Sequence, residues 1–218
     1  MFQSIGFLGT GQMGGALAQA AVKAVGGERV AVSCSTPEHS AEAAARLGCN
    51  PETAETILWE SRFVFLGVKP QMIAGVVKKL AGDIAGSDAI FVSMLAGTSL
   101  ERLAELLGAD KKIIRIMPNT PVSVGAGMVL YTANSLTTKS ELAEFTSALE
   151  LAGETDEISE EEMDAASVIS GCAPAFVFMF MKALADAGVR IGLDEKKSLF
   201  YAGQTLLGAA KLAIETGK

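Results

Sequence analysis

The sequence has 218 residues, half of them apolar, and its 18 Lys and Arg face 25 Asp and Glu for a net charge of -7. This acidic balance attracts neither nucleic acid nor an anionic membrane, so we expect no such partner. No basic segment precedes the first apolar residues, so no signal peptide is predicted, and the densest apolar run, Ala173–Met181, is too short to span a bilayer. Cys34, Cys49 and Cys172 form no C-x-x-C pair. They predict reduced, buried thiols in a cytoplasmic protein.

Up to about residue 158, short apolar segments alternate with amphipathic ones. Strands are predicted at residues 4–8, 30–33, 63–67, 89–94, 112–116, 128–131 and 154–157. Helices are predicted at residues 11–25, 37–47, 52–60, 71–80, 99–107 and 138–151. This alternation predicts an α/β fold with a parallel, doubly wound sheet of the Rossmann type over residues 1–158.

From residue 159 to residue 218 the pattern is helical throughout, which predicts a second, all-helical domain. Ser159–Glu162 supplies a capping serine and first-turn acids, and the helices are expected to break at 171–174 and 188–193. The run Phe176–Met181 has no polar face. A helix that is apolar all round must be buried on every side, so we expect a subunit interface here; a core helix is the alternative.

The N-terminal segment Ile5–Leu17 begins as an apolar strand, turns on glycines and continues in a helical pattern. Gly9, Gly11 and Gly14 have the G-x-G-x-x-G spacing. Their expected roles are a tight turn, close approach of the backbone to a pyrophosphate, and close packing of helix against strand. Strand, glycine turn and helix in this order predict a dinucleotide-binding site at the helix N-terminus.

Ligands of an open α/β sheet lie beyond the carboxyl ends of its strands, which singles out the residues after each predicted strand. Ser33–Thr36 holds no acid to bind a ribose 2′-hydroxyl, which favours NADP over NAD, although the usual phosphate-binding Arg is also missing. Capping of the next helix would explain these hydroxyls equally well. The other candidates are Lys69 before Pro70, the small pair Ala96 and Gly97, and Asn119 in a proline-bounded loop.

The sequence lacks the residues that several kinds of catalysis require. His39 is the single histidine and is expected on the surface, away from any nicotinamide. No cluster has metal-ligand spacing and no nucleophile motif occurs, so no metal is expected. Oxidation of an alcohol needs a base, whereas the nitrogen of an imine is itself basic, so the scarcity of histidine favours reduction of a C=N bond.

Five segments of the sequence together resemble one known family. They are Phe7–Gln12 (FLGTGQ), Val68–Pro70 (VKP), Ser93–Gly97 (SMLAG), Arg115–Pro121 (RIMPNTP), and Ser170–Phe176 (SGCAPAF) followed by Ala183–Leu193 (ALADAGVRIGL). The chain thereby resembles the pyrroline-5-carboxylate reductases. The resemblance implies a Rossmann domain followed by a helical domain that interlocks subunits as a homodimer, often assembled into decamers. It also implies reduction of L-1-pyrroline-5-carboxylate to L-proline with NADPH or NADH.

The glycine loop and the resemblance together assign site residues. Cofactor contacts are expected at Phe7, Leu8, Gly9, Thr10, Gly11, Gln12, Met13, Gly14, Ser33, Ser35, Val68, Lys69, Pro70, Leu95, Ala96, Gly97 and Asn119. The substrate region is expected at Asn119, Ser170, Gly171, Cys172 and Pro174.

The sequence departs from the family pattern in two places. Cys172-Ala173 replaces the usual Ser-Gly, a change we expect to be tolerated. The family also has a later S-P-G-G-T-T segment that binds the substrate carboxylate and supplies a threonine hydroxyl, and the 218 residues do not contain it. We expect that segment to lie beyond Lys218 in the natural protein, and no catalytic residue is assigned.

Two alternatives stay open. A β-hydroxyacid dehydrogenase needs a lysine soon after its helical-domain glycines, but Ala175 stands four residues after Gly171 and Lys182 is farther along. A dinucleotide-binding protein without turnover would explain the absent segment, although Met117–Pro121 and Ser170–Phe176 argue against it.

Overall fold

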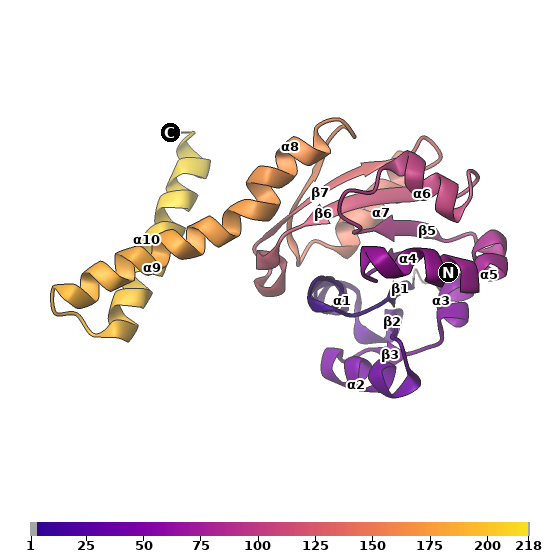
Figure 1. Cartoon of the computed structure of the whole chain (residues 1–218), viewed down its shortest axis with the longest axis horizontal. Helices are drawn as coiled ribbons and strands as arrows, with labels where there is room; N and C mark the ends of the chain where they lie inside the picture. The colour runs from indigo at the N-terminus through magenta and orange to yellow at the C-terminus, as the bar shows by residue number, and fades with distance from the viewer. Residues whose placement is uncertain (1–3, 218) are drawn as a thin grey trace. The chain divides into compact units, whose positions relative to one another are not determined.

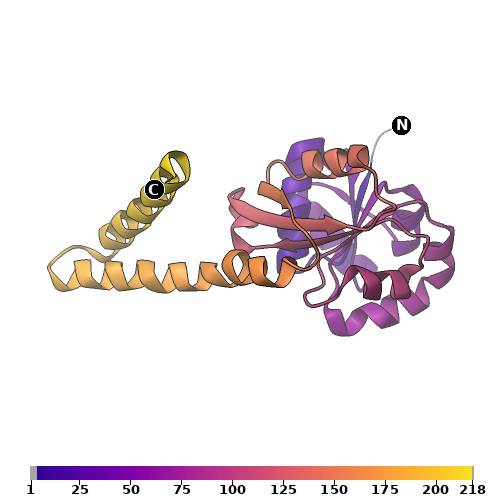
Figure 2. The same cartoon turned by 90° about the horizontal axis from the view of Figure 1, so that it is seen from above.

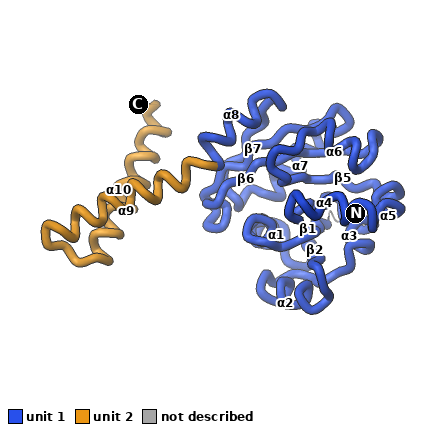
Figure 3. Tube along the Cα trace, viewed as in Figure 1, with its two compact units in different colours: residues 1–171 blue, residues 172–218 orange. Residues whose placement is uncertain are grey.

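The structure is a computed structural model that describes residues 4–217. The chain forms two compact units, one that ends at Gly171 and one that begins at Cys172 (Figure 3). The first unit is built on a sheet and the second is helical.

The first unit contains one eight-stranded sheet in the order β3-β2-β1-β4-β5-β6-β7-β8. Its strands are β1 (Ile5–Leu8), β2 (Val30–Ser33), β3 (Asn50–Pro51), β4 (Phe63–Leu66), β5 (Ile90–Ser93), β6 (Ile113–Pro118), β7 (Gly127–Ala133) and β8 (Gly153–Glu157). The predicted α/β, doubly wound Rossmann-type sheet is confirmed. The expectation that it is parallel throughout is wrong at β6 and β7, which pair antiparallel. Residues 119–126 between them hold only the short 3₁₀ helix η3 (Thr120–Val124), and a parallel pair needs a crossover of a dozen or more residues.

Helices cover both faces of the sheet (Figures 1 and 2). One face packs against α1 (Gln12–Val25), α2 (Pro37–Leu47) and α7 (Lys139–Ala148). The other packs against α3 (Ala54–Glu60), α4 (Ile73–Lys79), α5 (Ala81–Gly86) and α6 (Leu100–Leu107). The short 3₁₀ helices η1 (Gly27–Arg29) and η2 (Pro70–Met72) also belong to this unit. Sequence patterns missed β3, which has two residues of which one is proline, and α5, whose six residues include two glycines.

The central strands are apolar on both faces, as expected for strands covered by helices on either side. Phe7 of β1 stacks on Phe65 of β4 with ring centroids 4.5 Å apart, and Phe145 of α7 packs over Phe65. Leu8 and Leu66 point to the opposite face and join the second apolar cluster. Each of these buried side chains contributes about 1.5 to 3 kcal/mol to folding. The strands therefore form a rigid frame for the loops at their ends.

Beyond β8 the chain is helical. It forms α8 (Met163–Ser167), a π-helical turn η4 (Val168–Cys172), α9 (Ala173–Arg190) and α10 (Glu195–Thr216). The predicted break at 171–174 is wrong, because the chain continues from α8 into α9 through the π-helical turn. The predicted break at 188–193 corresponds to the link between α9 and α10, and the expected start at 159–162 lies just before Met163.

The helices α9 and α10 pack against each other and leave large apolar side chains exposed. Gly188 of α9 faces Ser198 of α10, and the hydroxyl of Ser198 donates to the carbonyl oxygen of Ala185 at 2.6 Å. The exposed side chains include Phe176, Val177, Phe178, Met179, Phe180, Phe200, Tyr201, Leu207, Leu212 and Ile214.

Within residues 4–217, one helix has the length and composition to cross a membrane. It is the continuous segment Met163–Arg190, which has a mean hydropathy of 1.8 over its most apolar window and 6% of that window buried. The apolar run Ala173–Met181 is only its middle part. Core helices of soluble proteins can have the same length and composition, so one such helix is weak evidence for a membrane span.

Candidate functional site

The carboxyl ends of the central strands line up at one edge of the sheet. Leu8 at the end of β1 lies opposite Ser33 of β2 and Leu66 of β4, and Leu66 lies opposite Ser93 of β5. The chain builds β1, β2 and β3 outward in one direction and then returns to place β4 on the other side of β1. A ligand crevice is expected at such a reversal. The loops after β1, β2, β4 and β5 therefore meet at one place.

The glycine loop has the geometry that its spacing predicts. Gly9 has φ +96°, and a Cβ there would lie 2.9 Å from the carbonyl carbon of Gly67. A Cβ on Gly14 would lie 2.6 Å from the carbonyl oxygen of Gly9, so helix and loop pack too closely for a side chain. A Cβ on Gly11 would meet nothing within 4 Å. Of the three, only Gly11 borders open space, where a ligand can approach the backbone.

The first turn of α1 offers backbone donors to that space. Gly11 is its N-cap, no side chain caps the helix, and its first turn holds no acid. Free N–H groups and the positive end of the helix dipole bind phosphate groups. The open face of Gly11 and these donors fit the pyrophosphate of a dinucleotide.

A cavity of about 500 Å³ lies beside this loop. Its lining brings predicted residues from separate strand ends together, and adds others from α2 and from the end of β4. It is lined by Gly9, Thr10, Gly11, Cys34, Ser35, His39, Glu42, Ala43, Arg46, Gly67, Val68, Lys69 and Met72. Two smaller cavities adjoin the same loops: one of about 450 Å³ includes Ser33 and Lys79, and one of about 410 Å³ includes Gln12 and Arg46.

A larger cavity of about 710 Å³ lies at the opposite edge of the sheet. Ile5 and Phe63, the first residues of β1 and β4, line it together with Glu144 of α7. Ligands of α/β sheets bind at the carboxyl ends of the strands, so size alone does not make this cavity the functional site.

Some predicted cofactor residues lie in the core rather than in a cavity. The side chains of Phe7, Leu8 and Leu95 are 0%, 4% and 2% exposed, so only their backbone atoms can face a ligand. Met13 packs against the apolar core. Ala96 and Gly97 are exposed beyond β5, outside the 500 Å³ cavity. Lys69 is extended before Pro70, which opens η2 as predicted.

The turn between β2 and α2 divides its hydroxyl groups between two tasks. The Oγ1 of Thr36 accepts a hydrogen bond from the backbone N–H of His39 at 3.3 Å and so caps α2. The Oγ of Ser40 accepts from the N–H of Cys34 at 2.8 Å. Ser35 is left to face the cavity, with its Oγ 3.2 Å from Nδ1 of His39. Capping therefore explains Thr36 but not Ser35.

Sequence reasoning missed several residues around the cavity. His39, which was expected on the surface and away from any nicotinamide, is exposed and also lines the cavity, as do Glu42 and Arg46. The available signal was the spacing 39, 42, 46 within the predicted helix 37–47, which places these side chains on one face of that helix. The expectation of buried thiols also needs correction. Cys34 is half-buried in the cavity wall with its Sγ 3.1 Å from Oγ1 of Thr10, Cys49 is half-buried and Cys172 is exposed. Burial raises the pKa of Cys49.

Asn119 joins two of the motifs. Its Nδ2 donates to the carbonyl oxygen of Ser170 at 2.9 Å, and its Oδ1 accepts from the N–H of Met128 at 2.9 Å. Pro174, four residues later, has no N–H and so offers the carbonyl of Ser170 no α-helical donor. A Cβ on the neighbouring Gly171 would lie 3.5 Å from Cε of Met117. Asn119, Ser170 and Gly171 thus lie together, whereas Cys172 and Pro174 belong to the start of the second unit.

An ion pair ties the segment after β8 to the sheet. Arg115 of β6 is buried, and its Nη1 donates to Oε1 of Glu160 at 2.7 Å. The same oxygen accepts from the backbone N–H of Leu100 at the start of α6. Asp164, which is exposed, lies 3.3 Å from Nη2 of Arg115. Glu160 therefore connects the start of α6 and the chain before α8 to the central sheet.

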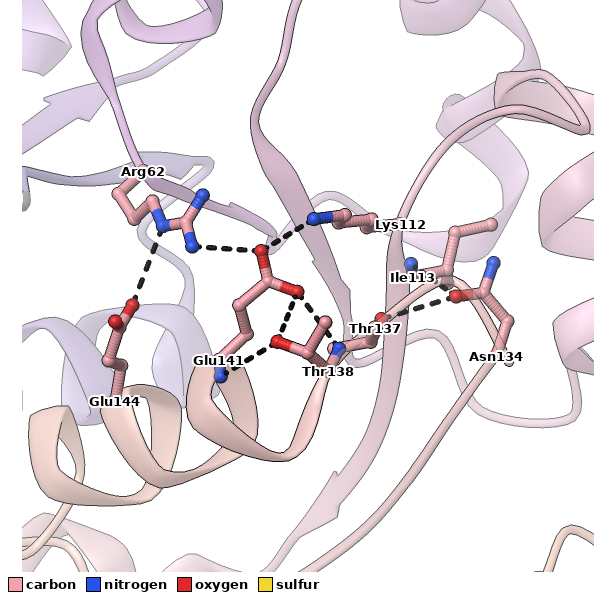
Figure 4. Close-up of polar contacts among 8 residues, drawn as sticks. All are labelled: Arg62, Lys112, Ile113, Asn134, Thr137, Thr138, Glu141 and Glu144. Carbon is pink, nitrogen blue, oxygen red and sulfur yellow. Dashed lines mark hydrogen bonds and ion pairs between the residues drawn. The ribbon is translucent and has the colours of Figure 1, made fainter.

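A second polar cluster lies at the opposite edge of the sheet (Figure 4). Oε1 of Glu141 accepts from Arg62 at 2.8 Å and from Lys112 at 2.6 Å, and its Oε2 accepts from the N–H and hydroxyl of Thr138. Burial raises the pKa of Glu141, but the hydrogen bonds from Lys112 and Thr138 outweigh it and lower the pKa from 4.5 to about 2. Arg62 and Lys112 precede β4 and β6, so this cluster stabilises the fold away from the cofactor edge. Across residues 4–217, no group of three or more His, Cys, Asp or Glu side chains is placed to hold a metal ion.

Comparison with known proteins agrees with this geometry. The family described as pyrroline-5-carboxylate reductase dimerisation matches residues 160–218, and the family described as NADP oxidoreductase coenzyme F420-dependent matches residues 4–97. The pyrroline-5-carboxylate reductase of Escherichia coli K12 is 35% identical over 221 aligned residues, which cover 100% of this chain and 82% of that protein.

Solved structures show the same relationship. The chain is similar to the Streptococcus pyogenes 1-pyrroline-5-carboxylate reductase, with a TM-score of 0.86 and 32% identity over 96% of this chain and 79% of that one. It is also similar to the Plasmodium falciparum pyrroline carboxylate reductase solved with NADP bound, with a TM-score of 0.85 and 28% identity over 97% of this chain and 78% of that one. With the glycine loop and the Asn119 loop in place at the carboxyl edge, the chain belongs to the pyrroline-5-carboxylate reductase family.

Proposed function

We propose that this chain reduces L-1-pyrroline-5-carboxylate to L-proline with NADPH or NADH, the last step of proline biosynthesis. The observation that carries the proposal is the 35% identity to the Escherichia coli reductase over the whole chain. When bound, the nicotinamide supplies a hydride to the C=N carbon of the substrate. Residues of this chain bind and orient the cofactor at the carboxyl edge of the sheet.

The proposed cofactor contacts follow the order of the strand ends. The N–H groups at Gly11 and Gln12 hold the pyrophosphate, supported by the open space at Gly11. Ser35 and Lys69 line the cavity beside it. Backbone atoms at Leu95–Gly97 border the ribose and nicotinamide, because the side chain of Leu95 is in the core.

Asn119, Ser170 and Gly171, with Cys172 and Pro174, are the proposed substrate region. Support comes from the hydrogen bond between Asn119 and Ser170, which joins the two motifs that the family resemblance assigns to substrate. In this arrangement Asn119 positions the backbone of Ser170. We assign no catalytic side chain within the 218 residues.

We also propose that residues 159–218 form a dimerisation domain and that residues 1–158 form the dinucleotide-binding domain. The dimerisation family match at 160–218 supports a second copy of this chain, rather than lipid, as the cover for the exposed apolar side chains of α9 and α10. Dimers of this kind can assemble further into decamers. Cys34, Cys49 and Cys172 are free thiols, which suits the cytoplasm.

The activity is tested by mixing the 218-residue chain with NADPH and pyrroline-5-carboxylate and following the absorbance of the reduced cofactor. A parallel calorimetric titration measures NADPH binding alone, and a panel of 3-hydroxy acids with NADP serves as the comparison. Consumption of NADPH only with the imine supports the proposal. Firm NADPH binding without turnover would restrict it to the dinucleotide site, and turnover of a hydroxy acid instead would overturn it.

The interface is tested by sedimentation of the wild-type chain and of Phe178→Glu, a substitution in the middle of α9. The side chain of Phe178 is 58% exposed in the single chain, so the substitution leaves the fold of one subunit intact. We expect self-association to weaken at least tenfold. Lys182→Gln, on the same helix, is the control and should leave association unchanged. A wild-type chain that sediments as a monomer at micromolar concentration would contradict the dimer.

A further inference from the structure

One face of α2 borders the nucleotide cavity along most of the length of the helix. His39, Glu42 and Arg46 follow one another at intervals of three and four residues, which places them on the same face of α2, and Ser35 lies just before the N-cap of the helix. All four line the 500 Å³ cavity together with the glycine loop. The cavity therefore has polar side chains from α2 in addition to those from the strand ends.

Arg46 brings a positive charge to this cavity. Its Nη2 lies 3.7 Å from the position of a Cβ on Gly15, beside the first turn of α1, and the residue also lines the neighbouring cavity with Thr10 and Gln12. Among residues 4–217 no acidic side chain forms an ion pair with Arg46, although Glu42 lies one turn before it. A guanidinium in this position can donate two parallel hydrogen bonds to a phosphate.

His39 supplies the second donor. Its Nδ1 is within 3.2 Å of Oγ of Ser35, which orients the ring beside the end of β2, where the adenosine ribose of a dinucleotide binds. No Asp or Glu follows β2 between Ser33 and Thr36, so no carboxylate there competes for the ribose hydroxyls. A 2′-phosphate on that ribose would lie in the cavity that Ser35, His39 and Arg46 line.

We propose that His39 and Arg46, together with Ser35, form the subsite for the adenosine 2′-phosphate and so set the preference of this chain for NADP over NAD. The inference rests on the proposed function, because it requires a dinucleotide at this edge. Glu42 lies between the two donors on the same face and opposes them, since its carboxylate repels the phosphate. Lys69, after β4, is the other charged side chain that lines the cavity.

In this proposal Arg46 binds the 2′-phosphate in place of the arginine that usually follows β2 and is missing here. It lies about ten residues farther along the chain than the usual position, but the rotation of α2 returns its side chain to the same cavity.

The test uses calorimetric titration of the 218-residue protein with 2′,5′-ADP and with 5′-ADP, two probes that differ in where the second phosphate sits. The variants are Arg46→Gln, His39→Gln and Glu42→Gln. Lys23→Gln, in the last turn of α1, is the control for loss of one positive charge. Thermal melting checks that each variant is folded.

We expect Arg46→Gln to weaken 2′,5′-ADP binding about tenfold or more, and His39→Gln to weaken it severalfold, as removal of charge-assisted hydrogen bonds predicts. Glu42→Gln should tighten it, and Lys23→Gln should leave it unchanged. Binding of 5′-ADP should change less than about twofold in every variant, since its phosphates bind at the α1 N-terminus.

A second readout does not depend on affinity. His39 is the single histidine, so the protein gives one set of imidazole signals in an NMR spectrum. These signals should shift on addition of 2′,5′-ADP and stay in place on addition of 5′-ADP.

Three results would overturn the inference. If R46Q lost affinity for 2′,5′-ADP and for 5′-ADP equally, Arg46 would lie at the pyrophosphate instead. A wild-type chain that binds 5′-ADP as tightly as 2′,5′-ADP, with unmoved His39 signals, would show that no 2′-phosphate subsite exists while leaving the dinucleotide site intact. Binding of neither ligand, together with no binding of NADPH, would reject the proposed function and this subsite with it.

Discussion

The side-chain amide of Asn119 donates to the carbonyl oxygen of Ser170 across 51 residues of sequence, at 2.9 Å. Pro174 leaves that carbonyl without its helical donor, and the π-helical turn η4 opens the helix at the same place. Turns of this kind are frequent at functional sites. The proline-bounded loop after β6 thus supplies a hydrogen-bond donor to the helical segment at Ser170, just before the break that the sequence predicts at 171–174.

Replacing Asn119 with alanine should destabilise the protein. The N–H of Met128 and the carbonyl of Ser170 both lose their partner, and Asn119 is half-buried, so we expect the free energy of unfolding to fall by about 1 to 3 kcal/mol. Urea denaturation measures the change. Ser123→Ala, which removes one exposed hydrogen bond in the same loop, is the control and should cost less than about 0.5 kcal/mol. Equal stabilities of N119A and wild type would show that water replaces the side chain at no cost.

Glycines 11 and 14 should respond differently to the same substitution. In Gly11→Ala the new methyl meets nothing in the protein, so stability should stay within about 0.5 kcal/mol of wild type while NADPH affinity falls at least about tenfold. In Gly14→Ala the methyl would lie 2.6 Å from the oxygen of Gly9, so stability itself should fall. Paired urea and NADPH titrations distinguish the two effects. Unchanged NADPH affinity in G11A would mean that the pyrophosphate does not approach this backbone.

The lowered pKa of Glu141 predicts an acid-sensitive contribution to stability. Its pKa is about 2 in the folded protein and 4.5 without the fold, so the unfolded chain binds the proton first as pH falls. The stabilisation is therefore complete above about pH 4.5 and is lost between about pH 4.5 and pH 2. The shift corresponds to about 3 kcal/mol.

Glu141→Gln should lower the free energy of unfolding at pH 7 by about 2 to 3 kcal/mol and flatten its decline below pH 4.5. Urea denaturation from pH 7 to pH 3 measures both effects. Glu144→Gln is the matched control, because its carboxylate is 3.5 Å from Nε of Arg62 and less buried, so it should cost under about 1 kcal/mol. An unchanged acid slope in E141Q would contradict the assignment.

The two acids beside Arg115 should differ in importance. Glu160→Ala leaves a buried guanidinium with only the exposed Asp164 nearby and removes the acceptor of the Leu100 N–H, so we expect a loss of about 2 kcal/mol or more. Asp164→Ala should cost under about 1 kcal/mol because its side chain is 89% exposed. Chemical denaturation of both variants measures which substitution lowers the free energy of unfolding more. If D164A proves the more damaging, Asp164 rather than Glu160 is the partner of Arg115.

Much of the carboxyl edge could be predicted because it follows directly from local sequence. Apolar runs mark the strands, so the residues after them, such as Gly9, Ser35 and Lys69, are expected from the sequence alone to share an edge. The roles of Gly9, Gly11 and Gly14 follow from their spacing. The family resemblance then predicts that the Asn119 loop and the Ser170 turn are parts of one site.

The remainder depends on features that local patterns do not encode. Arg46 reaches the cavity only through the rotation of α2 and the length of its own side chain. The direction of β7 depends on a loop too short for a crossover, and Glu160 is recognised only once Arg115 is seen to be buried. The π-helical turn occurs where Asn119, distant in sequence, donates to the carbonyl of Ser170.

The two edge strands of the sheet, β3 and β8, limit how copies of this chain can associate. β3 has two residues, one of them Pro51, which has no N–H to offer a neighbouring strand. β8 carries Glu154, Asp156 and Glu157, all exposed, so a second β8 placed alongside would bring like charges together. Strand addition is thus disfavoured at either border. The protein is protected against open-ended aggregation through its sheet, and ordered contact between copies is left to the helices.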